Sequence, residues 1–272
     1  MGARSSAKAT TAITSIKKLY PNANITFLEM DHKVLSSVVS AAKLFLSKES
    51  FLHALINNAG IMSTPFELTQ DGYEAQWQTN YLAHWVFTTH LLPLLLSTSK
   101  TLPSGSVRLV NVTSGGHFLA PKGGINFADT SLVKKPSNRY GQSKLANILH
   151  ARTINILYGP GSASAKAGTG EIWTSAVHPG LVDSQLAGRV EGTAEKALLS
   201  VFKFVGAYTD GDTGAWTSVF CAASPEMKRE QSGWYFERIA KKGMQSRAAK
   251  DMELAKRLEE WTKGEMEKGG WA

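Results

Sequence analysis

The stretch VRLVNVTS, residues 107 to 114, is a short apolar run that ends in two hydroxyl side chains. Comparable runs are ITFLEM (25–30), LHALINN (52–58), EIWTSAVHPG (171–180) and GWYF (233–236). Each is apolar nearly throughout, as expected of strands that are covered on both faces. The runs therefore predict a sheet with helices on its two sides.

Helical patterns separate these runs, and no repeat or linker divides the chain. The alternation predicts an α/β fold with a parallel sheet, formed as a single domain over residues 1–272. In the last helix, Met252, Ala255, Leu258 and Trp261 recur at helical spacing and predict one apolar face that packs on the domain. The expected helices span 33–48, 71–97, 139–158, 192–205, 211–223 and 247–266.

Composition excludes several classes of protein. The 272 residues, 43% of them hydrophobic, are enough for a well-buried core. The net charge of +8 comes from basic residues spread along the chain, so we expect no nucleic-acid site, although a phosphorylated small molecule would be attracted. The single cysteine, Cys221, is expected to be a buried small hydrophobe and fits a reducing compartment such as the cytosol. No apolar run reaches the ~18 residues of a membrane-spanning helix, so stable membrane insertion is not expected.

The N-terminal segment allows two interpretations. Its first 28 residues hold basic side chains and no acidic one, as in a mitochondrial presequence, and its start fits a loose myristoylation pattern. A helix with Ile13, Ile16 and Leu19 facing inward explains the same letters, and this is the interpretation we expect.

Polar residues follow three of the runs, where the carboxyl ends of parallel strands form the ligand crevice of an open α/β sheet. After the second run, residues 57–60 (NNAG) can let backbone approach a flat ligand while the asparagines brace neighbouring strands, or they form an ordinary turn. Thr113 and Ser114 follow the third run and could equally cap a turn. In the turn at 178–184, His178 is expected to be structural, and no histidine spacing indicates a metal site.

Tyr140 and Lys144 lie four residues apart in a predicted helix, which places them on one face. A phenol has an ordinary pKa near ~10, and a neighbouring ammonium would favour its ionised form and so lower that pKa. The phenol could then exchange protons at neutral pH. Alone, this spacing arises often by chance.

In combination the features are far more specific. In chain order they are NNAG at 57–60, Asn80 in TNYLAH, VNVTS ending at Ser114, Tyr140 followed by Lys144 in YGQSK, and HPGLVDS at 178–184. This set resembles the short-chain dehydrogenase/reductase family, and the C-terminal segments look like those of its retinol-dehydrogenase-like and fungal members. The resemblance extends from residue 4 to about residue 266.

The resemblance implies a role for each of four residues. Tyr140 would be the general acid or base on the substrate oxygen, and Lys144 would lower its pKa and bind the nicotinamide ribose. Ser114 would hold the substrate oxygen, and Asn80 would support a water relay to Lys144. The hydride partner would be a nicotinamide, because protein side chains cannot supply a hydride.

The resemblance also implies a cofactor site. Val182 and Ser184 would contact the carboxamide region of the nicotinamide, Asn58 the ribose side and Asp31 the adenine, together with Tyr140 and Lys144 at the reacting end. Arg4 matches the position where a basic residue pairs with the 2′-phosphate, which favours NADP over NAD. No metal is expected.

The sequence departs from the family pattern at its start. The family begins with a strand, a glycine-rich turn, a helix and a second strand, whereas this chain opens near the end of that second strand. We therefore expect a Rossmann-like doubly wound parallel sheet that lacks the first strand, the glycine-rich turn and most of the second strand. In the family order 3-2-1-4-5-6-7, this would expose the edge of a central strand and leave ITFLEM without a neighbour.

The expected function is hydride transfer between NADP(H) and a small alcohol or ketone. The likeness to fungal members of the family suggests a role in secondary-metabolite biosynthesis. The expected location is the cytoplasm. The segment 186–208 would supply apolar residues over the substrate. The missing start leaves three explanations open: an incomplete reading of the gene, a cofactor-independent isomerase or cyclase on the same fold, or a non-catalytic interaction protein. A homo-oligomer is compatible with all three.

Overall fold

The computed structural model describes residues 1–182 and 208–272. Within these residues, five strands form one sheet in the order β3-β4-β5-β6-β7. The first four run parallel, and the last is antiparallel to its neighbour. The strands are β3 (Ala54–Asn57), β4 (Arg108–Val112), β5 (Trp173–Val177), β6 (Trp234–Glu237) and β7 (Lys241–Lys242). Every residue of β4 and β5 is buried, which confirms the prediction of strands covered on both faces.

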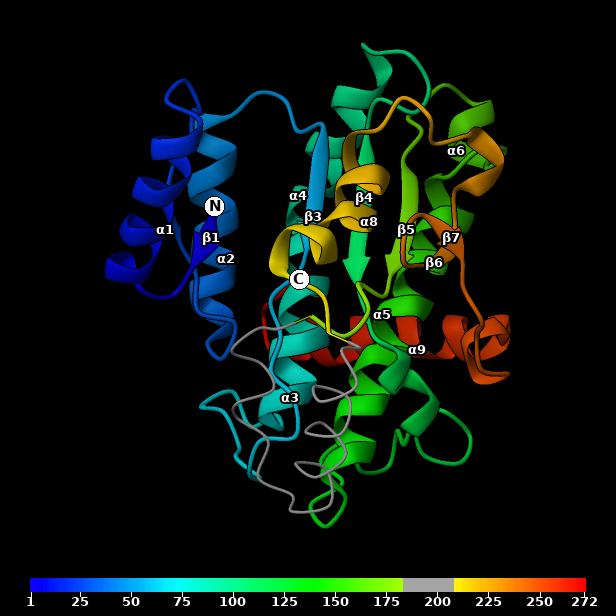
Figure 1. The fold of residues 1–272 in the computed structure, drawn as a ribbon. Coiled ribbons are helices and arrows are strands. Elements are labelled where there is room, and N and C mark those ends of the chain that lie inside the picture. Colours follow the sequence, from blue (N-terminus) through cyan, green and yellow to red (C-terminus); the bar gives the residue numbers. More distant parts are fainter. Residues whose placement is uncertain (183–207) are drawn as a thin grey trace.

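Helices cover both faces of this sheet. Figure 1 shows α8 (Gly211–Ala223) in front of the strands, with α4 (Ala83–Lys100) and α5 (Pro136–Tyr158) behind them. The helix α9 (Met252–Lys268) packs against α5, and its Ala255 and Leu258 are buried as the helical spacing predicted. The fold is thus the expected doubly wound α/β arrangement. Short helical segments are α6 (Ala163–Lys166), η2 (Gly115–Leu119), η4 (Arg229–Gln231) and η5 (Ala248–Lys250).

A separate two-stranded sheet forms at the N-terminal side. Strand β1 (Gly2–Ala3) pairs in parallel with β2 (Leu28–Glu29). The helix α1 (Ser6–Leu19) connects them, and α2 (Leu35–Lys48) follows and packs against α4. The expectation that ITFLEM would lack a neighbour is therefore wrong, because the few residues before α1 already supply one.

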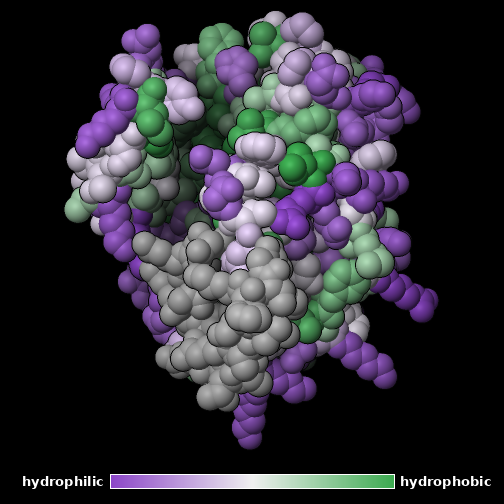
Figure 2. Space-filling model, in the orientation of Figure 1, coloured by the Kyte–Doolittle hydropathy of each residue, from purple (hydrophilic) through white to green (hydrophobic). Residues whose placement is uncertain are grey.

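The edge of β3 that faces this small sheet is open. Among the described residues, β3 hydrogen-bonds only to β4, and Ile56 on β3 remains 42% exposed. Figure 2 shows a hollow between the N-terminal elements and the rest of the molecule, with hydrophobic side chains inside it. The expected exposure of a central strand edge is confirmed in this part of the chain.

The inward face predicted for α1 is wrong for Ile16 and Leu19, whereas Ile13 is half-buried. Ile16 is 37% exposed and Leu19 is 76% exposed, and Ala9 is the one residue of the helix that is buried. Figure 1 places α1 on the outer side of β1 and α2, where the small sheet offers it little apolar surface. The periodic pattern is present, but its partner surface is too small to cover it.

The helix predicted over 71–97 is divided. It consists of α3 (Ala75–Trp77), a π-helical turn η1 (Gln78–Leu82) and α4, so the helix starts later and continues further than the pattern indicated. The helix predicted at 192–205 lies outside the described residues. No helix in the described ranges is both long and apolar enough to cross a membrane.

Candidate active site

Ser114 stands directly after β4, at the carboxyl edge of the sheet. Its hydroxyl accepts a hydrogen bond of 3.0 Å from the Gly116 amide and so caps the short helix η2. The same side chain hydrogen-bonds with Tyr140, which lies near the start of α5. The neighbouring Thr113 hydroxyl instead donates to the Lys144 carbonyl at 2.6 Å, which fastens α5 to the strand end. Ser114 thus combines the turn-capping role with a contact to the predicted acid.

Tyr140 and Lys144 share one face of α5, as predicted, and both are buried. The Lys144 ammonium nitrogen lies 5.9 Å from the centroid of the Tyr140 ring. Burial raises the pKa of Tyr140 above its ordinary value, while the hydrogen bond with Ser114 acts in the opposite direction. The expected lowering of this pKa by Lys144 is therefore wrong for the structure described here, since desolvation of the phenolate outweighs the favourable contacts.

The same burial acts on Lys144 in the opposite sense, because it disfavours the charged ammonium. It lowers the pKa of Lys144 to about 8. In the described residues the ammonium reaches one acceptor, the Val112 carbonyl at 3.1 Å. An ammonium has three donors, so two remain for a ligand.

The side chains of Asn80 and Lys144 lie beside Gly60. A Cβ atom on Gly60 would lie 3.2 Å from Asn80 Oδ1 and 3.3 Å from Lys144 Nζ, so both side chains border this glycine. The Asn80 amide accepts from the Ile61 amide at 2.8 Å and donates to the Ile61 carbonyl and to Ser143 Oγ, both at 2.9 Å. A glycine at position 60 thus lets the Asn80 and Lys144 side chains approach the backbone closely, whereas the predicted approach of a flat ligand to NNAG stays a prediction.

These residues surround a cavity of about 1350 Å³ at the carboxyl edge of the sheet. The predicted residues that line it are Asn58, Ser114, Tyr140, Lys144 and Val182. The cavity continues along the open edge of β3 towards the N-terminal sheet, so it is larger than most single-ligand pockets. Leu181 and Tyr208 also line it, whereas most of the predicted substrate segment 186–208, and Ser184 with it, lies outside the described residues.

Arg4 and Asp31 lie at the other end of the predicted cofactor site and do not line this cavity. Each comes just after a strand of the small parallel sheet, in which Ala3 pairs with Glu29, so both occupy the same carboxyl edge. Arg4 is exposed, while an Asp31 carboxylate oxygen accepts from the Lys33 amide at 2.9 Å. Arg4 and Asp31 therefore follow neighbouring strands at the same edge of the small sheet, and neither lines the cavity that Ser114, Tyr140 and Lys144 line.

One residue that contacts Ser114 was not identified from the sequence. This residue is His117 in η2, which is fully buried, and its Nδ1 lies 2.8 Å from the Ser114 carbonyl oxygen. Its Nε2 accepts from the Ser246 amide at 3.2 Å, so Nδ1 carries the proton and donates to Ser114. Burial lowers the pKa of His117. Its short separation from Ser114 in the sequence is the one signal that could have indicated this contact.

Comparison with known proteins decides the family. A profile described as short chain dehydrogenase matches residues 1–128. A short-chain dehydrogenase/reductase of Aspergillus calidoustus, drtF, is 52% identical over 272 residues, which cover 98% of this chain and 85% of that protein. The chain belongs to the short-chain dehydrogenase/reductase family. An uncharacterized oxidoreductase of Schizosaccharomyces pombe is 42% identical over 236 residues, covering 85% of this dehydrogenase-family chain and 66% of the relative.

Solved structures agree on the fold of this short-chain dehydrogenase/reductase. The crystal structure of an uncharacterized protein from Mycobacterium paratuberculosis superposes with a TM-score of 0.70 at 26% identity, covering 98% of this chain and 83% of that one. An NADPH-bound carbonyl reductase from chicken fatty liver gives a TM-score of 0.58 at 19% identity, with 86% and 82% covered, which is evidence of fold alone. Family membership makes this chain an oxidoreductase that transfers hydride with a nicotinamide cofactor.

The residues present fit the nicotinamide end of such a cofactor. Lys144 has free donors beside the cavity, and Gly60 leaves room where any larger residue would contact both Asn80 and Lys144. Asn58 and Val182 line the adjoining walls. For the pyrophosphate, the described residues contain no glycine-rich turn that opens a helix, so no residues are assigned to that part.

Proposed function

We propose that this short-chain dehydrogenase/reductase interconverts a small alcohol and the corresponding ketone with NADP(H). The observation that carries the proposal is the convergence of Ser114, Tyr140 and Lys144 on one wall of a large cavity at the carboxyl edge of the sheet. No other arrangement of a buried phenol, a hydroxyl and an ammonium occurs around this cavity among its described lining residues.

When bound, the nicotinamide supplies or accepts the hydride at the substrate carbon. During reduction, Ser114 holds the carbonyl oxygen, and Tyr140 donates its phenolic proton to that oxygen as the alcohol forms. Because burial raises the pKa of Tyr140, the phenol holds its proton at neutral pH and is ready to donate it. The Lys144 ammonium would bind the ribose through its two free donors. Oxidation is the reverse reaction, in which the tyrosinate form of Tyr140 takes up the proton of the alcohol.

We propose NADP rather than NAD because of Arg4. Its exposed guanidinium follows β1 directly and stands in register with the residues after β2, where Asp31 would contact the adenine side. A guanidinium there can form two parallel hydrogen bonds with a 2′-phosphate. Exchanging Arg4→Glu should therefore weaken NADPH binding far more than NADH binding.

A role in secondary-metabolite biosynthesis is proposed on the 52% identity with a fungal member of the family. Deleting the gene and comparing extracts by mass spectrometry tests it, since a ketone or alcohol should accumulate in the deletion strain. The same strain, complemented with a fluorescently tagged copy, tests the proposed cytoplasmic location.

The central test uses purified full-length chain. NADPH binding is measured by fluorescence, and NADPH oxidation is followed at 340 nm with a panel of small ketones, for the wild type and Tyr140→Phe. The proposal requires ketone-dependent oxidation that the variant loses. Product formation without any absorbance change would indicate cofactor-independent acid/base chemistry, and a stable protein that responds in neither assay would indicate an interaction protein.

A further inference from the structure

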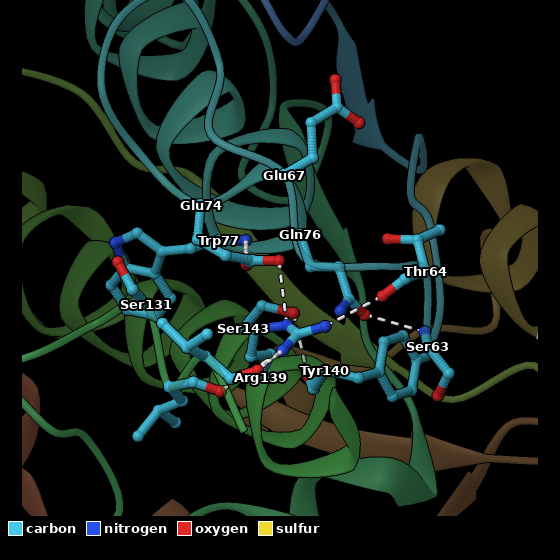
Figure 3. A network of polar contacts seen from close by, with 12 residues as sticks. Ser63, Thr64, Glu67, Glu74, Gln76, Trp77, Ser131, Arg139, Tyr140 and Ser143 are labelled. Atoms are coloured by element: carbon cyan, nitrogen blue, oxygen red, sulfur yellow. Dashed lines mark hydrogen bonds and ion pairs between the residues drawn. The ribbon is translucent and has the colours of Figure 1, made fainter. Parts of the chain in front are cut away.

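Arg139 immediately precedes Tyr140 in α5, and its guanidinium is buried rather than solvated, at 2% exposure of the side chain. Its Nε lies 3.1 Å from Oε1 of Glu74, whose side chain is fully buried. Figure 3 shows the two side chains facing each other across the space between α3 and α5, close to Tyr140. Taking a charge pair out of water is costly, and the cost is offset only where further hydrogen bonds satisfy both groups.

The remaining guanidinium nitrogens bind backbone carbonyls of two separate loops. Nη2 donates to the Thr64 carbonyl at 2.9 Å, and Nη1 donates to the Val133 carbonyl at 2.8 Å and the Leu132 carbonyl at 3.3 Å. A guanidinium is the one side chain that can make all these contacts at once, since it is a rigid fork with five donors. Arg139 thus joins α3 and the two loops to α5, at the position directly before Tyr140.

In both loops the backbone is strained at or next to a residue whose carbonyl accepts a hydrogen bond from Arg139. Leu132 has a φ of 42°, and Ser63, the neighbour of Thr64, has a φ of 46°. Residues with side chains seldom adopt this left-handed conformation, and it persists only where surrounding contacts impose it. The guanidinium supplies such contacts to each loop.

The loop at 61–64 is also held from the other side. The Ile61 amide donates to Asn80, and the Ser63 amide donates to Gln76 Oε1 at 2.9 Å. This loop continues the NNAG segment and lines the cavity with its Ile61 and Met62. Asn80, Gln76 and Arg139 therefore hold one wall of the cavity. Asn80 links that wall to α5 through Ser143, and Arg139 links it to α5 at the residue next to Tyr140.

Glu74 fixes the guanidinium in turn. Its second oxygen, Oε2, accepts from the Trp77 amide at 2.8 Å and caps α3. Burial raises the pKa of Glu74, while the Arg139 charge and the backbone contacts act to lower it. The backbone amides of Trp77 and Gln76 and, after them, the Arg139 charge therefore favour the ionised carboxylate against the effect of burial.

We propose that Arg139 is a positioning residue for Tyr140, which sets the phenol against the cavity wall at 61–64 by holding that wall, the loop at 132–133 and Glu74 on one guanidinium. It does not touch the reacting atoms. The part of the proposal that concerns turnover rests on the proposed function, whereas the placement of Tyr140 can be measured without a substrate.

The test compares Arg139→Met and Arg139→Lys with Arg108→Met. Arg108 is a matched control because it is also buried and binds the carbonyls of Gly105, Phe220 and Cys221, but from the opposite end of β4 to Ser114. Each full-length protein is labelled with ¹³C at the tyrosine ring carbon that bears the hydroxyl. Among the 7 tyrosines, the signal of Tyr140 is assigned by its loss in Tyr140→Phe.

We expect the Tyr140 signal to shift in both Arg139 variants and its titration midpoint to move by about half a pH unit or more. Lysine keeps the charge beside Glu74 but has one nitrogen in place of the fork, so Arg139→Lys should not restore the signal. Arg108→Met should lower thermal stability and leave the Tyr140 signal unchanged. In ketone reduction, kcat should fall about 10- to 100-fold in the Arg139 variants while KM for NADPH stays nearly constant.

The outcomes separate the two proposals. An unchanged Tyr140 signal in folded Arg139→Met, or a wild-type signal in Arg139→Lys, would overturn the positioning role and leave Arg139 as a structural charge. If the wild type reduces no ketone, the proposed function fails, but a shifted Tyr140 signal still supports the positioning role.

Discussion

The Asn57 side chain on β3 donates a hydrogen bond of 2.9 Å to Asn111 Oδ1 on β4, so the two strands are joined through side chains as well as through the backbone ladder. Asn57 also donates to Thr88 Oγ1 on α4, and Asn111 donates to the Asn147 carbonyl on α5. Both asparagines are buried. The pair thus fastens the sheet to two helices directly behind the cavity.

Replacing Asn111 with alanine should lower the free energy of unfolding by about 2 kcal/mol, because the change leaves one N–H of the buried Asn57 amide without an acceptor and removes the link from β4 to the Asn147 carbonyl. Urea denaturation measures this loss. Asn138→Ala is the control, since its hydrogen bond to the Leu119 carbonyl is open to water and should contribute less than about 0.5 kcal/mol. Equal effects of the two substitutions would show that the buried pair has no special contribution.

Gly60→Ala should reduce turnover with little effect on stability. The new methyl would lie 3.2 Å from Asn80 Oδ1 and 3.3 Å from Lys144 Nζ, so the end of the lysine side chain must move away from the nicotinamide site. Cofactor binding, followed by fluorescence titration, should weaken about 10-fold or more. Gly264→Ala in α9 meets no atom within 4 Å and should leave binding intact while stabilising the helix by about 1 kcal/mol. Wild-type binding in Gly60→Ala would refute the close approach.

Lys144→Met should stabilise the protein at neutral pH while abolishing its activity. Burial lowers the pKa of Lys144 from its ordinary 10.5 to about 8, so between these values the unfolded chain binds more protons than the folded chain. Stability then rises with pH across that window, and below it the buried charge lowers stability by about 3 kcal/mol at most. The advantage of Lys144→Met should therefore be largest below pH 8 and fade towards pH 10.5.

Denaturation at several pH values measures this difference. The control is Lys263→Met, because that side chain lies on α9 and stays 64% exposed. A difference between wild type and Lys144→Met that stays constant from pH 6 to 10 would contradict the depressed lysine pKa.

Ser114→Ala should raise the pKa of Tyr140 further. The hydrogen bond with Ser114 is the contact that opposes the effect of burial on this phenol, so removing it favours the neutral form. In a pH profile of kcat/KM, the limb that reports Tyr140 should move to higher pH, and turnover should fall about 100-fold because the substrate oxygen also loses its holder. Ser97→Ala, on the surface of α4, is expected to change neither quantity. A Tyr140 limb that moves to lower pH would be incompatible with the geometry.

The strands around Ser114 and the helix around Tyr140 could be predicted because their signals are local. A mostly apolar run such as 107–114 and a spacing of four between Tyr140 and Lys144 depend only on neighbours in the sequence. The pairing of β1 with β2 could not be predicted, since two-residue strands carry no periodic pattern. The exposure of Leu19 was missed because an amphipathic pattern does not state how large the opposing surface is.

The sequence by itself determined the order of strands and helices, the family, and the set of polar residues at the carboxyl edge of the sheet, because backbone periodicity and strand ends follow from consecutive residues. Only the tertiary structure decided the pKa values of these polar residues and the contacts that hold them in place. The pKa of Tyr140 rises because the whole surrounding fold excludes water from it. Arg139 and Glu74 form an ion pair because α5 and the start of α3, which are distant in the sequence, pack against each other near Tyr140. The spacing of residues along the chain does not predict that contact.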